Sequence, residues 1–115
     1  MALSYILANL LADVPKAEAV IFLDKEGETI DSLTSKINPF DIKVIGAYQG
    51  IYFNQFQKTF SNVKSFWYLG GKHSVFCILV GEEYYLVLIT KGKTHPGIAY
   101  HFLEKAKKEL EEKVL

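Results

Sequence analysis

The feature that most constrains this chain is a long helix predicted at residues 39–61, because its apolar residues cover two sides. Asn38 is a favourable N-cap, Pro39 suits the first helical position, and Asp41 complements the positive helix end. Successive residues of a helix are about 100° apart, which places its apolar residues on two sides. One side carries Ile42, Ile45, Gln49, Phe53, Phe56 and Phe60. Nearly the opposite side carries Phe40, Val44, Ala47 and Ile51, and Tyr48 and Tyr52 lie between the two sides.

This apolar surface is too wide for a helix that packs on one sheet. Such a helix needs an apolar stripe about 100° wide, and the stripe here is roughly twice as wide. One sheet in a chain of 115 residues cannot cover both sides. The pattern therefore predicts that a second chain covers the rest, and a symmetric homodimer is the commonest arrangement of that kind.

Two glycines interrupt this helix, in the stretch IGAYQGI at residues 45–51. Each costs about 0.5–1 kcal/mol relative to alanine in a helix interior. Gly46 and Gly50 fall where the side that carries Phe53 and Phe60 meets the polar arc. Three interpretations remain open: a tolerated packing accident, close approach of the helix of a second copy, or a docking groove for a third protein.

The rest of the chain is predicted to form short helices and strands. Residues 3–12 predict an amphipathic helix, and a tight turn at 24–27 joins two predicted strands. Further strands are predicted to end at Gly70-Gly71 and before the turn KGK at 91–93. The last predicted helix has Thr94 as N-cap and Pro96 in its first turn. The predicted strands are 18–24, 28–34, 63–69, 73–80 and 84–90. This order predicts one α/β (α+β) domain over residues 1–115, with a mostly antiparallel sheet.

The charged residues narrow the classes of partner. Thirteen basic residues balance thirteen acidic ones, so neither nucleic acid nor an anionic membrane is expected as a partner. All thirteen basic residues are lysine, which excludes an arginine finger supplied by this chain. Surfaces rich in lysine and glutamate are also typical of thermophiles.

The sequence shows no arrangement of catalytic or metal-binding residues. His73, His95 and His101 lie in separate elements, and Cys77 alternates with the core residues of a strand. The lysine-glycine turns GGKHS and KGKT lack the spacing of a phosphate-binding loop. We therefore expect a protein that is not an enzyme and that needs no cofactor.

The expected location is the cytoplasm. A single cysteine allows no disulfide within the chain, and the first residues lack the features of a signal peptide. Apolar runs are shorter than the roughly 18–20 residues of a membrane span, so no membrane insertion is expected.

Three segments together resemble the Roadblock/dynein light chain family of the longin-like group, and in particular its MglB-like prokaryotic branch. They are AVIFLDKEGETIDSL at 19–33, the long helix at 39–61, and the strand-rich run at 64–90. The resemblance implies a five-stranded antiparallel sheet, with the long helix on one face and the N- and C-terminal helices on the other.

The same resemblance implies a homodimer formed through helix 39–61 and strand 63–69, with the two sheets joined into one. We therefore predict a dimer or partner interface that contains Ile42, Ile45, Gly46, Gln49, Gly50, Phe53, Phe56, Gln57, Phe60, Phe66, Trp67 and Tyr68.

The resemblance implies a regulator or scaffold that binds a small Ras-like GTPase, and that stimulates GTP hydrolysis by rearranging the catalytic groups of the GTPase itself. An assembly adaptor of the dynein-light-chain type, without a GTPase partner, is the alternative. A small-molecule sensor would need a cavity, whereas the dense apolar pattern at 73–90 favours a filled core.

Overall fold

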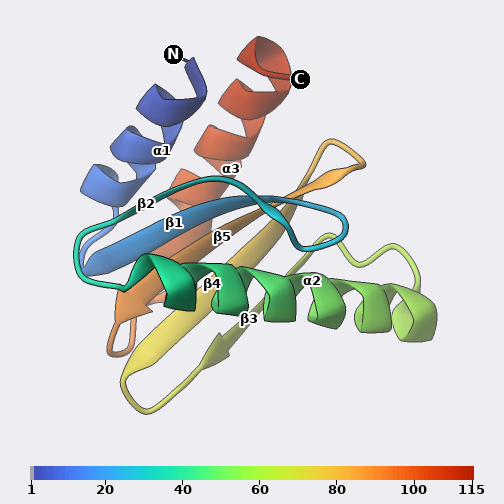
Figure 1. Ribbon diagram of the computed structural model, residues 1–115, viewed down its shortest axis with the longest axis horizontal. Helices are drawn as coiled ribbons and strands as arrows, with labels where there is room; N and C mark the ends of the chain where they lie inside the picture. The colour runs from blue at the N-terminus through green and yellow to red at the C-terminus, as the bar shows by residue number, and fades with distance from the viewer. Residues whose placement is uncertain (1) are drawn as a thin grey trace.

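The computed structural model describes residues 2–115, which form three helices and one five-stranded sheet (Figure 1). The sheet order is β2-β1-β5-β4-β3, and every neighbouring pair of strands is antiparallel. The elements are α1 (Ala2–Asp13), β1 (Ala17–Asp24), β2 (Thr29–Thr34), α2 (Pro39–Phe60), β3 (Ser65–Leu69), β4 (His73–Val80), β5 (Tyr84–Lys91) and α3 (Pro96–Lys113).

The sheet lies between two helical layers, with α2 on one face and α1 and α3 on the other (Figure 1). Strand β1 shows how the sequence produces this arrangement, because its residues alternate between the faces. Ile21 and Leu23 pack in the core under α2, whereas Val20 and Phe22 pack under α1 and α3. Both faces are thus buried, and the predicted fold class is confirmed.

Local signals placed several boundaries correctly. The Asn38 side chain accepts a hydrogen bond from the backbone amide of Phe40 at 2.8 Å and caps α2 as predicted. In the β1–β2 turn, Asp24 Oδ1 accepts bonds from the amides of Glu26 and Glu28, each at 3.0 Å, and Gly27 has φ +85°. The aspartate thus forms the Asx-type loop that its position before Gly27 predicts.

The predicted start of the last helix was wrong by one residue. His95 is the N-cap of α3, because its Nδ1 accepts a hydrogen bond from the Gly97 amide at 3.0 Å. The Thr94 hydroxyl instead donates to the Thr90 hydroxyl at 2.8 Å, at the end of β5. The Thr94 side chain is thus directed to the preceding strand, and the His95 ring nitrogen serves as the cap.

Candidate interaction surface

One side of α2 is bound to its own sheet. Ile42 and Phe53 are fully buried, and the Phe53 ring stacks on Tyr85 with 4.1 Å between ring centroids and meets Phe66 edge-on at 4.7 Å. Such contacts stabilise the layer through buried area and favourable ring geometry. The sheet-facing side is therefore a completed core within one protomer.

The two glycines belong to this same packed side. A Cβ at Gly46 would stand 2.8 Å from Leu23 Cδ2, and a Cβ at Gly50 would stand 2.8 Å from Gly27 Cα in the β1–β2 turn. Both glycines are buried. They allow the backbone of α2 to approach the chain's own hairpin, so Gly46 and Gly50, which the sequence analysis assigned to an interface, are covered within the protomer. None of the three interpretations from the sequence included this contact.

Gln49 is a buried polar residue that ties α2 to two strands. Its Oε1 accepts a hydrogen bond from the Tyr68 hydroxyl at 3.2 Å and lies 3.6 Å from the Cys77 sulfur, while its Nε2 donates to the Ile45 carbonyl at 3.1 Å. Both ends of the amide are thus satisfied, as burial requires. Gln49, which the sequence analysis assigned to an interface, thus has an internal role in the protomer.

The remaining predicted residues divide into two groups. The first group is covered within the protomer, and it consists of the buried Ile42 and Phe53 and the partly buried Ile45, Phe56, Gln57 and Phe66. Gln57, for example, binds the backbone of Val63 through both ends of its amide. The side chains of the two buried residues, which were also assigned to the interface, are already covered within the protomer. Phe60, Trp67 and Tyr68 are exposed.

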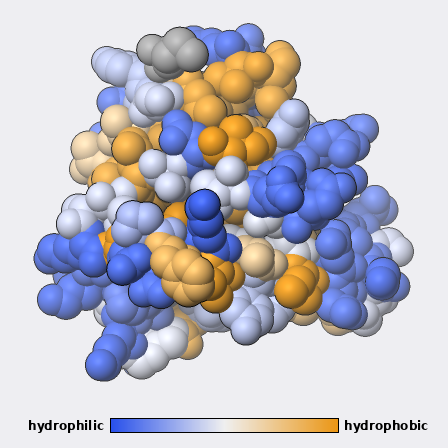
Figure 2. All heavy atoms as spheres, viewed as in Figure 1, coloured by the Kyte–Doolittle hydropathy of each residue, from blue (hydrophilic) through white to orange (hydrophobic). Residues whose placement is uncertain are grey.

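The outer side of α2 carries the exposed apolar residues that need a cover. Phe40 is 72% exposed, Tyr48 52% and Ile51 51%. Figure 2 shows apolar side chains along this outer side, interleaved with hydrophilic ones. We call the following set the α2–β3 surface: Phe40, Val44, Tyr48, Ile51, Tyr52 and Tyr68. Exposed apolar residues that gather on one face mark an interaction site.

Aromatic contacts make this surface continuous from the helix to the strand. Tyr48 stacks on Tyr52 at 6.3 Å, and Tyr52 meets Tyr68 edge-on at 6.3 Å. Burial raises the pKa of the Tyr68 hydroxyl, against the opposing effect of its bond to Gln49. The surface is therefore held in a defined conformation before any partner binds.

Strand β3 forms one edge of the sheet and is held by α3. The Tyr100 hydroxyl lies 2.7 Å from the Phe66 carbonyl oxygen and 3.1 Å from that of Cys77, and so bridges β3 and β4. Trp67 points to the face opposite Tyr68 and stacks on Phe76 at 6.2 Å. Within residues 2–115, β3 has no strand on its outer side, which leaves backbone groups free for pairing.

The titratable residues are spread over structural roles. His73 pairs with Glu18, and His95 caps α3. Burial raises the pKa of the Cys77 thiol well above its usual value, which keeps it in the unreactive protonated form. In the part of the chain that the structure describes, no three His, Cys, Asp or Glu residues are grouped to hold a metal ion, and no helix is long and apolar enough to cross a membrane.

The sequence contained a signal that could have identified the outer side of α2. Both sides of the helix are apolar, so periodicity alone could not decide which one packs on the sheet. A helical position that must lie against another backbone favours glycine, and Gly46 and Gly50 therefore mark the sheet side. Without this step, the predicted site left out the exposed residues on the other side of α2, which are Phe40, Val44, Tyr48, Ile51 and Tyr52.

Comparisons with known proteins agree with this architecture. No family model and no curated protein matches the sequence. Solved structures do match: the gliding protein MglB of Thermus thermophilus has a TM-score of 0.86 at 14% identity, over 96% of this chain and 87% of that one. MglB of Myxococcus xanthus has a TM-score of 0.82 at 22% identity, over 96% and 86%.

A Roadblock/LC7 domain from Streptomyces avermitilis matches with a TM-score of 0.80 at 11% identity, over 94% of this chain and 93% of that one. These identities are low, and the shared property is the order and packing of the elements. The chain therefore has the fold of the Roadblock/LC7 and MglB proteins, as its sequence resemblance predicts.

Proposed function

We propose that this protein is a homodimeric regulator or scaffold, without catalysis of its own, that binds a small Ras-like GTPase. The observation that carries the proposal is the α2–β3 surface, where six large or aliphatic side chains remain exposed beside an unpaired sheet edge. A chain that otherwise fills both faces of its sheet would not keep such a surface without a partner.

A second copy of the chain suits this surface best. Strand β3 can pair with the same strand of another copy in antiparallel fashion, because a two-fold axis places identical edges side by side. The two outer α2 sides would then lie next to each other over the joined sheet and bury Tyr48, Ile51 and Tyr52. One of the matched structures is described as MglB with a tetrameric arrangement, which supports self-association as a property worth testing here.

The GTPase is the proposed partner of the dimer rather than of the single chain. The proposal draws on the likeness to the MglB structures and on the resemblance of the sequence to that branch. Because the chain has thirteen lysines and no arginine, it cannot insert an arginine finger. If the protein stimulates GTP hydrolysis, it would do so by repositioning catalytic groups of the GTPase itself.

Two measurements test the proposal separately. Sedimentation velocity gives the mass in solution, and a dimer is expected at micromolar concentration. GTP hydrolysis by the small Ras-like GTPases of the same genome is then measured with and without the protein, together with nucleotide-dependent binding. A monomer contradicts the dimer. A dimer that neither binds a GTPase nor changes hydrolysis contradicts the GTPase role and favours the adaptor.

A further inference from the structure

A cleft of about 660 Å³ lies between the N-terminal half of α2 and the sheet. This volume falls in the range of small-molecule sites, roughly 300–1,000 Å³. Its apolar wall is formed by Ile37, Val44, Ile45, Val75 and Ile89. The core below is filled, as the sequence predicts, so the cleft exists at the boundary between helix and sheet rather than inside a layer.

Glu18 lies at the floor of this cleft because β1 is irregular at that point. The register between β1 and β5 shifts between Ala17 and Ala19, so strict alternation fails there. Ala19 packs in the core under α2, and Glu18 lines the cleft on the same face. Strand bulges redirect side chains in this way, and they are frequent beside functional sites.

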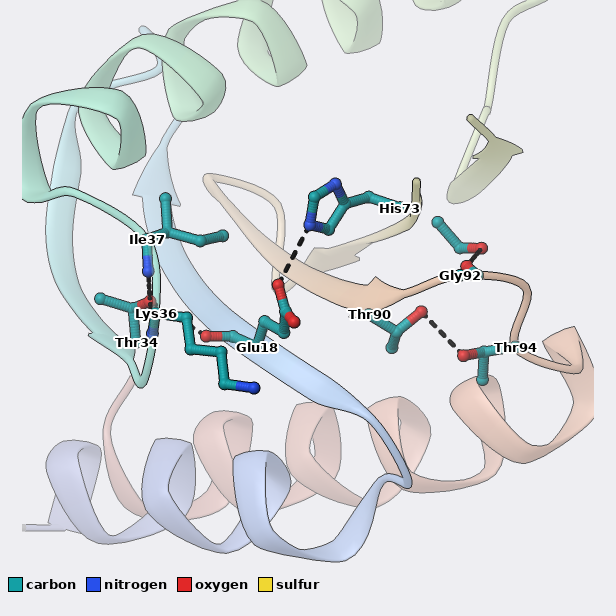
Figure 3. A network of polar contacts seen from close by, with 9 residues as sticks. Glu18, Thr34, Lys36, Ile37, His73, Thr90, Gly92 and Thr94 are labelled. Carbon is teal, nitrogen blue, oxygen red and sulfur yellow. Dashed lines mark hydrogen bonds and ion pairs between the residues drawn. The ribbon is translucent and has the colours of Figure 1, made fainter. Parts of the chain in front are cut away.

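The backbone around the bulge is fixed by the segment that leads into α2. The Glu18 carbonyl accepts hydrogen bonds from the Thr34 hydroxyl at 3.0 Å and from the Ser35 amide at 3.1 Å. Figure 3 shows Thr34 and Lys36 beside Glu18, with the Glu18 carboxylate directed toward His73. The backbone that carries the carboxylate is thus fixed before any ligand binds, which reduces the entropic cost of binding.

The Glu18 carboxyl group has a single protein partner. The residue is 8% exposed, and its Oε1 lies 3.0 Å from Nε2 of the half-exposed His73. Among residues 2–115, no hydrogen bond reaches Oε2, and this oxygen is not one of the buried atoms that lack a partner, so it stays accessible from the cleft. An accessible carboxylate oxygen without a protein donor can accept a charge-assisted hydrogen bond from a cationic N–H group.

The other charges around the cleft are consistent with a cation at the floor. Asp41 adds negative charge in the first turn of α2, where the Phe40 amide is already capped by Asn38 and is not free for an anion. Lys36 is exposed at the rim. Its ammonium group can stay in water on its flexible side chain when a ligand enters.

We propose that the cleft binds a small organic cation, with an ammonium or guanidinium group on an aliphatic body. The cationic group would donate to Glu18 Oε2, and the aliphatic body would lie against the apolar wall. Glu18 is the residue that selects the charge. The cleft shares Val44, Tyr48 and Tyr68 with the α2–β3 surface, whereas Glu18 on β1 lies outside that surface. Binding is therefore measured beside the oligomeric state of each variant.

The test compares three six-carbon probes that differ in charge: hexylammonium, hexanol and hexanoate. Each is titrated into the ¹⁵N-labelled protein in its native oligomeric state, and amide shifts are followed. Hexylammonium is expected to bind with saturation at residues 18, 44–49 and 73, at least tenfold more tightly than hexanol. Equal affinities of the amine and the alcohol, or no saturable binding of the amine, would overturn the proposal.

Two substitutions with opposite expected effects test the role of charge. Glu18→Gln keeps the shape and should weaken hexylammonium about tenfold, the order expected for a lost charge-assisted hydrogen bond, while hexanol is unaffected. Lys36→Gln removes a repelling charge from an exposed position and should tighten hexylammonium at low salt. The control is Glu82→Gln, which removes a carboxylate from the exposed β4–β5 turn.

Each outcome of this comparison decides the proposal. Weakening by Glu18→Gln and tightening by Lys36→Gln, with Glu82→Gln unchanged, would support it. An unchanged Glu18→Gln variant would overturn it, as would an equal change in all three variants. Sedimentation of each variant, run in parallel, separates this result from the outcome of the proposed dimerisation.

Discussion

Gly50 in α2 lies directly against Gly27 in the β1–β2 turn, where a Cβ atom at position 50 would stand 2.8 Å from the Gly27 Cα. The partner atom is backbone, and it belongs to a residue with φ +85°, so it cannot move aside as a side chain would. This contact sets the distance between α2 and the β1–β2 hairpin, and it leads to the first prediction.

Gly50→Ala is expected to destabilise the protein even though alanine is the better helix former. Helix propensity gains about 1 kcal/mol, but a methyl group forced into a packed contact costs about 1–3 kcal/mol. We expect a net loss of roughly 1 kcal/mol in the free energy of unfolding, measured by urea denaturation.

Two other glycines serve as matched controls for that substitution. The methyl group of Gly46→Ala would meet a side-chain methyl of Leu23 rather than backbone, so its loss should be smaller than that of Gly50→Ala. Gly71→Ala meets nothing within 4 Å and should leave stability nearly unchanged. Equal effects at positions 46 and 50 would show that the backbone contact with Gly27 is not the cause.

Ile51→Glu should dissociate the proposed dimer without unfolding the protomer. Ile51 is exposed at the centre of the outer side of α2, so a carboxylate there costs little in the free chain and much in a buried interface. Sedimentation should show a rise in the dimer dissociation constant of about 100-fold or more.

The control is Tyr5→Glu, which places the same charge on an exposed site of α1, on the other face of the sheet. Its dimer should remain intact. If Ile51→Glu sediments like the parent chain, the α2–β3 surface does not form the dimer.

Gln49 and Tyr68 should show energetic coupling in a double-mutant cycle. Gln49→Leu removes the acceptor of the Tyr68 hydroxyl and should cost about 1–3 kcal/mol through lost hydrogen bonding. Tyr68→Phe alone should cost less. Because the two residues share one bond, the double variant should be more stable than additivity predicts, by about 0.5–1 kcal/mol. Strict additivity in urea denaturation would exclude the bond as a source of stability.

Stability should decline at alkaline pH. Burial raises the pKa values of the Tyr100 hydroxyl and the Cys77 thiol above their ordinary values of 10.0 and 9.0. The native state therefore keeps these protons at a pH where the unfolded chain releases them. The contribution of these two protonated groups to the free energy of unfolding is complete below pH 9. It is lost as the pH rises through their pKa values in the unfolded chain and then through their higher pKa values in the native state.

The Tyr100→Phe variant isolates one part of this effect. It should be less stable than the parent at pH 7, because the bridge to the carbonyls of Phe66 and Cys77 is lost. Its decline above pH 10 should be shallower, because one titrating group is gone. Unfolding free energies measured from pH 7 to pH 11 with an identical slope for both proteins would contradict this account.

The elements that the sequence predicts correctly depend on short-range signals. Asn38 with Pro39, and Asp24 with Gly27, determine their own caps and turns from a few neighbouring residues. The order of the elements along the chain follows from the apolar runs and the turn signals between them. The fold class was therefore predictable, together with most helix and strand boundaries, whereas the face of the sheet that each helix covers was implied only by the family resemblance.

The site was harder to predict because it depends on contacts between distant residues. Which side of α2 faces the sheet is decided by Gly50 and Gly27, which are far apart in the sequence. The direction of Glu18 is decided by a register shift against β5 that periodicity cannot reveal. As a result, the predicted interface included the packed side of α2 and left out much of the exposed side.

The contact between Gly27 and Gly50 also limits how this sequence can diverge. Position 27 requires glycine for its backbone conformation, and position 50 requires it for the space that the turn occupies. A relative that acquires a side chain at position 50 would have to lengthen or redirect the 24–27 turn in compensation. In an alignment of relatives, the identity of residue 50 and the length of that turn are therefore expected to vary together.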